Sequence, residues 1–159
     1  MLRAIILAAA LTCAASASAQ TPPTAPPSDP TLVPVTDSNV RFPGFLDVSH
    51  LERDGATDVA RFWIFNVFPE PMTSDHGGNA DGSWARYEMP CHGDQSRRLG
   101  AVWINNAGDI ISLIGPGQPG ATTETSPMGI ARRAACTGAL PVGAQLHSAA
   151  DAIARVRAH

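Results

Sequence analysis

The chain of 159 residues contains no lysine, so all 11 of its basic residues are arginine. This absence excludes a Schiff-base lysine, a Ser–Lys dyad and a phosphate-binding loop that ends in Gly-Lys-Ser/Thr. The arginines are scattered, and 14 acidic residues outnumber them, for a formal net charge of −3. Binding to nucleic acid depends on a basic surface that neutralises phosphates, so the composition predicts no nucleic-acid partner.

A long apolar run is also missing. Arg3 precedes an apolar segment, residues 4–14, whereas a membrane span needs roughly 20 apolar residues. Small side chains at Ala17-Ser18-Ala19 then provide a signal peptidase site. We therefore predict that residues 1–19 are a cleaved signal peptide and that the mature chain starts at Gln20 without a transmembrane span. Its expected location is the periplasm or the cell surface and extracellular space.

Proline is concentrated near the new N-terminus. Six prolines lie between Pro22 and Pro34, a density that favours an extended chain over a packed element. We predict that residues 20–40 form a flexible proline-rich segment, which is either a spacer or a disordered tail without a function. The remainder is the size of one domain. We place a β-rich domain at residues 41–140 and a helical extension at residues 141–159.

Cysteine is scarce. Cys13 leaves with the signal peptide, which leaves Cys91 and Cys136. An even pair in an exported chain is most simply a disulfide, here closing a loop of about 46 residues. The competing interpretation is a metal site, because His92 follows Cys91. Adjacent residues rarely ligate one ion well, and an oxidising compartment favours the disulfide.

Strand patterns dominate the predicted domain. Residues 58–68 have apolar side chains on both faces, which is typical of a central strand covered on both sides. Residues 69–82 contain two prolines and three glycines, so we expect a long surface loop there. The predicted strands are 45–51, 58–68, 84–89, 98–105 and 109–114.

Two helices are expected to follow the strands. Ser126-Pro127 is a helix start, and Gly138 ends the predicted helix 127–136. Ser148 and Asp151 form a capping box for a last helix, 149–157, whose weak apolar face predicts loose docking. The predicted fold class is therefore α+β: an antiparallel sheet of about five or six strands with a packed C-terminal helix and one disulfide.

Motifs for catalysis and metal binding are incomplete. Residues 77–88 match the ligand positions of a calcium loop except the first, where Gly77 stands in place of an acid. None of the histidines has zinc-site spacing. His92, Asp94 and Ser96 share the residue types of a hydrolase site, but three residues of one turn do not generally form a catalytic relay. We predict no catalytic residue, metal ligand or cofactor. The five histidines are His50, His76, His92, His147 and His159.

The tryptophans suggest where a partner could bind. Trp63 and Trp103 lie on predicted strands and are expected in the core. Trp84 shares a strand face with Arg86 and Glu88. An exposed tryptophan beside an arginine is typical of a binding hot spot. Trp84 and Arg86 are therefore the candidate binding surface.

Several short motifs occur in an order that resembles the surface-adhesin protein E family of exported bacterial domains. They are D-V-S-x-L-x-R-D-G at residues 47–55, Phe62-Trp63, Tyr87-x-x-x-Cys91, Arg97-Arg98-Leu99 and a short helix ending in Cys136. The resemblance covers about residues 45–136 and has no counterpart after Ala139. It implies an antiparallel sheet with a helix, a Cys91–Cys136 disulfide and a non-enzymatic role at the cell envelope; named members bind host extracellular-matrix proteins.

The resulting hypothesis is an exported, non-enzymatic binding or structural domain whose partner is an unknown protein or envelope component. The alternative is a small periplasmic hydrolase or metal-binding protein that uses the loops with His76, His92 and Asp94.

Overall fold

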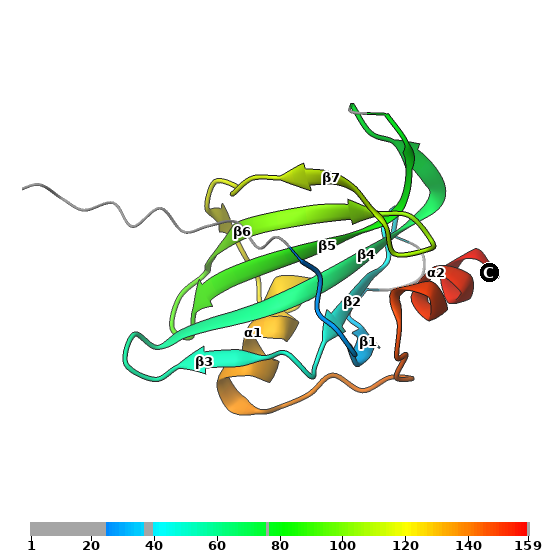
Figure 1. Cartoon of the computed structure of the whole chain (residues 1–159). Coiled ribbons are helices and arrows are strands. Elements are labelled where there is room, and N and C mark those ends of the chain that lie inside the picture. The colour runs from blue at the N-terminus through cyan, green and yellow to red at the C-terminus, as the bar shows by residue number, and fades with distance from the viewer. Residues whose placement is uncertain (1–24, 37–39, 76, 159) are drawn as a thin grey trace, which may run out of the picture.

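The computed structural model describes residues 25–36, 40–75 and 77–158; the predicted signal peptide, residues 1–19, and the predicted start at Gln20 lie outside the described residues. The described chain forms a curved antiparallel sheet with two helices (Figure 1). The elements are β1 (Leu32–Pro34), β2 (Gly44–Asp47), β3 (Glu52–Asp54), β4 (Val59–Thr73), β5 (Asn79–Pro90), β6 (Gln95–Ile104), β7 (Ile110–Ile114), β8 (Gly120–Ala121), α1 (Pro127–Thr137) and α2 (Ala149–Arg157). Within the described residues, neither helix has the length and apolar character to cross a membrane.

The long strand β4 lies in the middle of the sheet, as predicted for residues 58–68. The sheet order is β1-β2-β4-β5-β6-β7, with β3 beside β4 and β8 beside β6. All of these pairings are antiparallel. From β4 to β7 each strand pairs with the one that precedes it, so hairpin connections account for this part of the order, whereas β2 pairs with β4 across the short strand β3.

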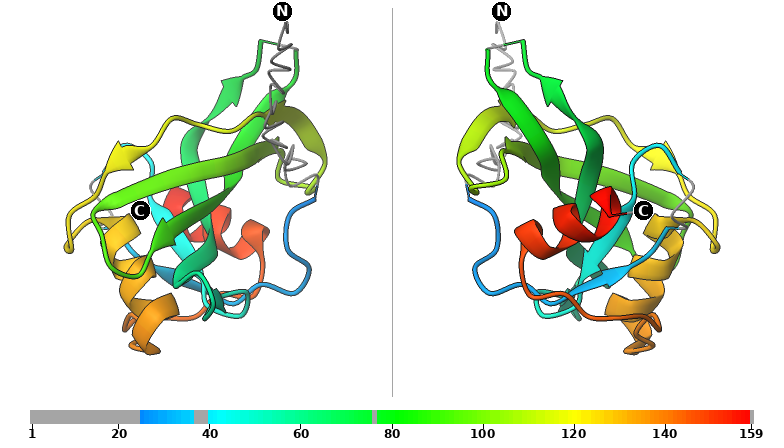
Figure 2. Two further views of the ribbon diagram at one scale, coloured as in Figure 1. Left: turned by 90° about the vertical axis from the view of Figure 1, so that its left-hand side faces the viewer. Right: turned by 90° about the vertical axis from the view of Figure 1, so that its right-hand side faces the viewer.

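The side chains of β4 alternate between two cores on opposite faces of the sheet. Trp63 and Phe65 belong to the core that includes Ile153 of α2, and we call this side the α2 face. Phe62 and Ile64 belong to the core completed by α1, and we call this side the α1 face. Figure 2 shows α1 in orange and α2 in red on different sides of the curved sheet. The predicted α+β fold with a packed C-terminal helix is confirmed.

Both helices begin and end where their capping residues predict. The Ser126 hydroxyl accepts a hydrogen bond from the backbone N–H of Gly129, and Gly138 ends α1 at a φ of 77°. The Ser148 hydroxyl accepts from the backbone N–H of Asp151 at the start of α2.

Burial raises the pKa of Tyr87, on the α1 face, while the charge of Arg98 opposes this shift.

The predicted long loop at residues 69–82 is wrong. β4 continues to Thr73 and β5 begins at Asn79, so the two strands form one extended hairpin. The register shifts between Val67 and Met72, which is where Pro69 and Pro71 interrupt the ladder. The guanidinium of Arg157, at the end of α2, donates to the carbonyl oxygens of Phe68 and Pro69, each at 3.3 Å. The irregular backbone is therefore bonded by a side chain from the end of the chain.

Described residues of both segments placed outside the β-rich domain pack with it. Leu32 of β1 is fully buried, and its backbone N–H donates to the Leu146 carbonyl at 2.8 Å, with a return bond of 2.9 Å. This pairing corrects the boundaries 20–40 and 141–159. The expectation that α2 docks loosely is also wrong, because Ala152 and Ile153 are buried in the α2-face core. The small Ala152 side chain suits close packing of the helix on the sheet.

The predicted disulfide between Cys91 and Cys136 is confirmed. It joins the residue after β5 to the last turn of α1, with a Cα–Cα distance of 5.7 Å. Arg53 of β3 donates a hydrogen bond to the Cys136 carbonyl at 2.8 Å. The disulfide thereby holds α1 against the end of the sheet that this helix covers.

Candidate functional site

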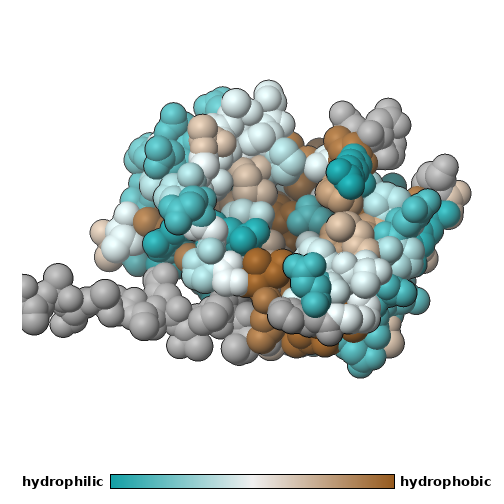
Figure 3. Space-filling model, turned by 90° about the horizontal axis from the view of Figure 1, so that it is seen from above, coloured by the Kyte–Doolittle hydropathy of each residue, from teal (hydrophilic) through white to brown (hydrophobic). Residues whose placement is uncertain are grey.

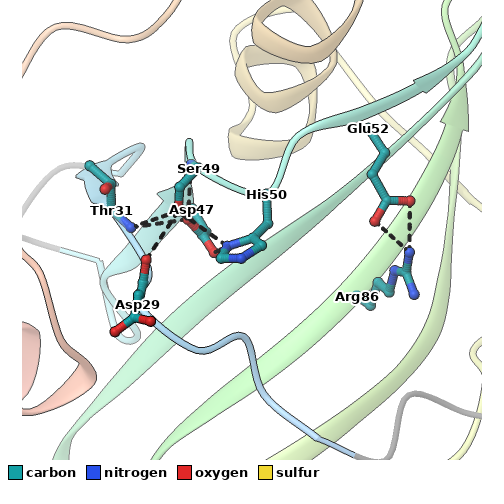
Figure 4. Close-up of polar contacts among 7 residues, drawn as sticks. All are labelled: Asp29, Thr31, Asp47, Ser49, His50, Glu52 and Arg86. Atoms are coloured by element: carbon teal, nitrogen blue, oxygen red, sulfur yellow. Dashed lines mark hydrogen bonds and ion pairs between the residues drawn. The ribbon is translucent and has the colours of Figure 1, made fainter.

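A buried carboxylate organises the corner after β2. Asp47 is fully buried, and its Oδ1 accepts hydrogen bonds from the backbone N–H groups of Thr31 at 3.1 Å and Ser49 at 3.0 Å. The Ser49 hydroxyl also donates to Oδ1 at 2.6 Å, and Nδ1 of His50 lies 2.6 Å from Oδ2. Figure 4 shows these side chains converging on Asp47 beside the segment that carries Asp29.

This cluster has the residue types of a Ser–His–Asp site but not its geometry. In a catalytic relay, histidine contacts the acid through one ring nitrogen and the serine through the other. Here Nδ1 of His50 makes both contacts, at 2.6 Å to Asp47 and 3.1 Å to the Ser49 hydroxyl. The Asp-x-Ser spacing is instead typical of an Asx turn, which bonds its own backbone two residues on. The cluster therefore fastens the segment before β1 to the corner between β2 and β3.

The predicted binding surface at Trp84 is wrong because α2 covers that face of the sheet. Trp84 is only 2% exposed, and its ring packs against Phe65 at 4.9 Å and Trp63 at 6.3 Å between centroids. Arg86 lies over the Trp63 ring at 5.8 Å, and its guanidinium donates to both carboxylate oxygens of Glu52 at 2.8 Å (Figure 4). Arg86 thus has an ion-pair partner and a ring partner within the chain, while its buried Nε has no hydrogen-bond partner among the described residues.

The other polar residues singled out in the sequence do not gather at one place in the described chain. The His92 side chain is 93% exposed, and its Nε2 lies 3.4 Å from Asp58. His76 lies outside the described residues, and the Asp94 carbonyl bonds the backbone of Thr122. Among residues 25–36, 40–75 and 77–158, no three His, Cys, Asp or Glu side chains are placed to hold a metal ion.

Residues 77–88 are a hairpin turn and a strand rather than a calcium loop. Asp81 accepts hydrogen bonds from Arg157 and from the backbone N–H of Asn106, each at 2.6 Å. Glu88, at the other end of β5, pairs with Arg61 and Arg97. The two carboxylates therefore have partners of their own at separate places on the strand.

Asp54 has a lowered pKa, and its surroundings explain why. The hydroxyl of Thr57 donates to its carboxylate at 2.8 Å, and the backbone N–H of Ala56 donates at 2.9 Å. These hydrogen bonds favour the charged carboxylate and so lower the pKa of Asp54. The shifted group belongs to the turn between β3 and β4, where it stabilises the chain reversal.

An aromatic pocket lies on the part of the α1 face that α1 leaves open. Its volume is about 290 Å³. The Phe68 ring is central to its wall, at 5.3 Å from the Trp103 ring and 5.5 Å from the Phe42 ring, both edge to face. Seen from above, the molecule has a hollow where hydrophobic residues gather (Figure 3). The pocket is lined by Phe42, Asn66, Phe68, Met72, Ser83 and Trp103.

Strand register brings the polar members of the pocket together. Asn66 of β4 pairs with Ser83 of β5, which in turn pairs with Trp103 of β6, so the three side chains share one face. Neither the Asn66 amide nor the Ser83 hydroxyl forms a side-chain hydrogen bond with a described residue. Both groups are therefore available to a ligand. Trp103, expected in the core, is half-buried at the pocket wall.

Sequence reasoning missed this pocket, although a signal for it exists. Asn66 interrupts the apolar side of β4, where Phe62, Ile64 and Phe68 have the same two-residue period. A polar residue at such a position marks either a hydrogen-bonded core group or an opening in the core.

Comparisons with family models, with curated proteins and with solved structures find no match to this chain.

Proposed function

We propose that this chain is an exported, non-enzymatic cell-envelope protein, a binding domain of the surface-adhesin type. Export is supported by the signal-peptide pattern of residues 1–19 and by the disulfide, a bond that persists in oxidising compartments. The order of motifs between residues 45 and 136 supports the surface-adhesin type. The ligand is a protein or another envelope component.

The observation that carries the proposal is the aromatic pocket. Ligand sites are concave and mostly apolar, with a few polar groups that fix orientation. Here aromatic rings form the wall, and Asn66 and Ser83 add polar groups that form no side-chain hydrogen bond with a described residue. A volume of about 290 Å³ is at the lower limit of such sites, so it suits one apolar or aromatic group.

The chemistry of the lining defines the kind of ligand. Aromatic rings favour an apolar or aromatic side chain, because ring contacts contribute beyond the buried area. The Asn66 amide can donate to and accept from a peptide group next to that side chain. We therefore place a side chain of a partner protein, with its adjoining backbone, in the pocket. The guanidinium of Arg41, which is not a lining residue, lies 5.0 Å from the centre of the Phe42 ring that lines the pocket.

Site-specific photo-crosslinking in the native host tests the proposal. With a benzophenone amino acid at Met72, we expect an adduct with an envelope component, because Met72 is half-buried at the pocket. Trp103→Ala should reduce the adduct by about fivefold or more, since truncation of an aromatic anchor commonly costs over about 1 kcal/mol. Trp103→Phe, which keeps a ring, should retain most of it.

The control places the same crosslinker at Leu140, which is exposed and absent from the pocket lining. Thermal unfolding of Trp103→Ala separates a lost contact from a lost fold. An adduct at Met72 no stronger than that at Leu140, or one unchanged by Trp103→Ala in a folded protein, would refute binding at this pocket.

A further inference from the structure

The sheet has several free edges, and charge, proline, shortness or cover protects all but one of those described. β1 pairs through Leu32 with Leu146 and ends in Pro34. β3 consists of Glu52, Arg53 and Asp54, which are all charged, and β8 has two residues. Charge, proline, shortness and cover are the usual protections of a sheet edge against pairing with another chain.

The last strand in the sheet order, β7, has no charge, no proline and no covering segment among the described residues, and its one protection is a bulge at Ile111. Its sequence, IISLI, contains no charge and no proline, and among the described strands it pairs with β6 alone (Figure 1). Ile110 is 46% exposed and Leu113 is 61% exposed. A free edge offers backbone N–H and C=O groups in a row, and apolar side chains beside them favour another uncharged strand.

We propose that β7 pairs in antiparallel fashion with β7 of a second copy of this chain, so that the two sheets become continuous. Trp103 pairs with Ser112 while the next β6 residue, Ile104, pairs with Ile110, which makes Ile111 the extra residue of a bulge. Regular strand geometry therefore remains at residues 112–114. Leu113, at the centre of this stretch, lies on the twofold axis of the pair.

Exposure and charge both favour this arrangement. Residues directly opposite each other in an antiparallel pair share one face, so the exposed Leu113 covers its counterpart. Ser112 then lies opposite the half-buried Ile114 of the other copy, on the α1 face. In a parallel pair the two Asp109 carboxylates would lie side by side, whereas the antiparallel pair separates them.

A second copy is the occupant because β7 is its own complement. The edge accepts an extended, uncharged segment that itself has a free edge, and β7 is the strand in the described chain that meets all three conditions. Each copy has one such edge, so the pairing is isologous and stops at a dimer. The three regular residues that each copy contributes bury less than a standard interface, so the dimer should dissociate on dilution.

Sedimentation velocity of the mature full-length chain tests the proposal over a micromolar to millimolar range. We expect a monomer that converts to a dimer as concentration rises. Leu113→Arg should keep the chain monomeric, because two arginines would meet at the axis. Leu140→Arg is the matched control, the same change at an exposed leucine outside β7, and should dimerise as the unchanged chain does. Circular dichroism establishes that both variants are folded.

A cysteine at the proposed axis tests the register. Leu113→Cys should form an intermolecular disulfide on mild oxidation faster than Val142→Cys, which is fully exposed elsewhere. A chain that stays monomeric throughout the range, a dimer that survives Leu113→Arg, or equal crosslinking at both cysteines would each overturn the proposal. A β7 that pairs only with a different protein would give the first of these results.

Discussion

Replacement of both Cys91 and Cys136 by alanine is expected to lower the free energy of unfolding by about 4 kcal/mol. The disulfide joins residues 45 positions apart, and this constraint limits the conformations open to the unfolded chain. Domains of this size are stable by only about 5–15 kcal/mol, so the loss is a large share of the total. Urea unfolding of the oxidised protein and of the double variant measures it.

Reduced wild-type protein is the matched control for the disulfide prediction, because it lacks the bond but keeps both sulfur atoms. Its unfolding midpoint should lie near that of the double alanine variant. A double variant within about 1 kcal/mol of the oxidised protein would show that the sheet and helices alone hold α1 in place.

Asp47→Ala is expected to cost about 3 kcal/mol of unfolding free energy. The carboxylate is fully buried, and its removal leaves the backbone N–H groups of Thr31 and Ser49 without their acceptor. The loss should loosen the segment before β1 first, since Asp47 fastens Thr31 to the corner after β2. Urea unfolding measures the total cost, and hydrogen exchange at Thr31 and Ser49 locates it.

Asp47→Asn is the matched variant, because an amide oxygen can still accept from both backbone N–H groups. It should cost about 1 kcal/mol, and Ser49→Ala a similar amount. An Asp47→Ala protein as stable as Asp47→Asn would contradict the assignment of Asp47 as the acceptor that holds these donors.

The strands and helices could be predicted from the sequence where local patterns agree with the fold. Residues 58–68 are apolar on both sides, and β4 is indeed covered by a helix on each face. Ser126, Gly138 and Ser148 mark helix ends because capping depends on groups a few residues away. The disulfide could be predicted because only two cysteines follow the predicted signal peptide.

What could not be predicted depends on contacts between distant segments. Pro69 and Pro71 indicate a loop locally, but Arg157 at the end of the chain bonds the irregular backbone and the hairpin continues. Local sequence places Leu32 in a proline-rich tail, but its backbone pairs with Leu146, which is more than 100 positions away in the sequence.

The predicted exposure of Trp84 is wrong for a similar reason. Alternation correctly puts Trp84 on one face with Arg86, but it does not show that α2 covers Trp84. The pocket beside Trp103 lies on the α1 face and exists because α1 does not extend over that part of the sheet. No local sequence pattern encodes how far α1 extends over the sheet. Asn66 was the one residue whose polarity could have indicated an opening there.

The central claim is that this chain works outside the cytoplasm as a processed, oxidised domain, and intact mass tests it most directly. The protein is recovered from the envelope and medium of its native host and alkylated with and without reduction. We predict a chain that starts at Gln20 and gains two alkyl groups only after reduction. A chain that starts at Met1, or thiols that react without reduction, would contradict the account.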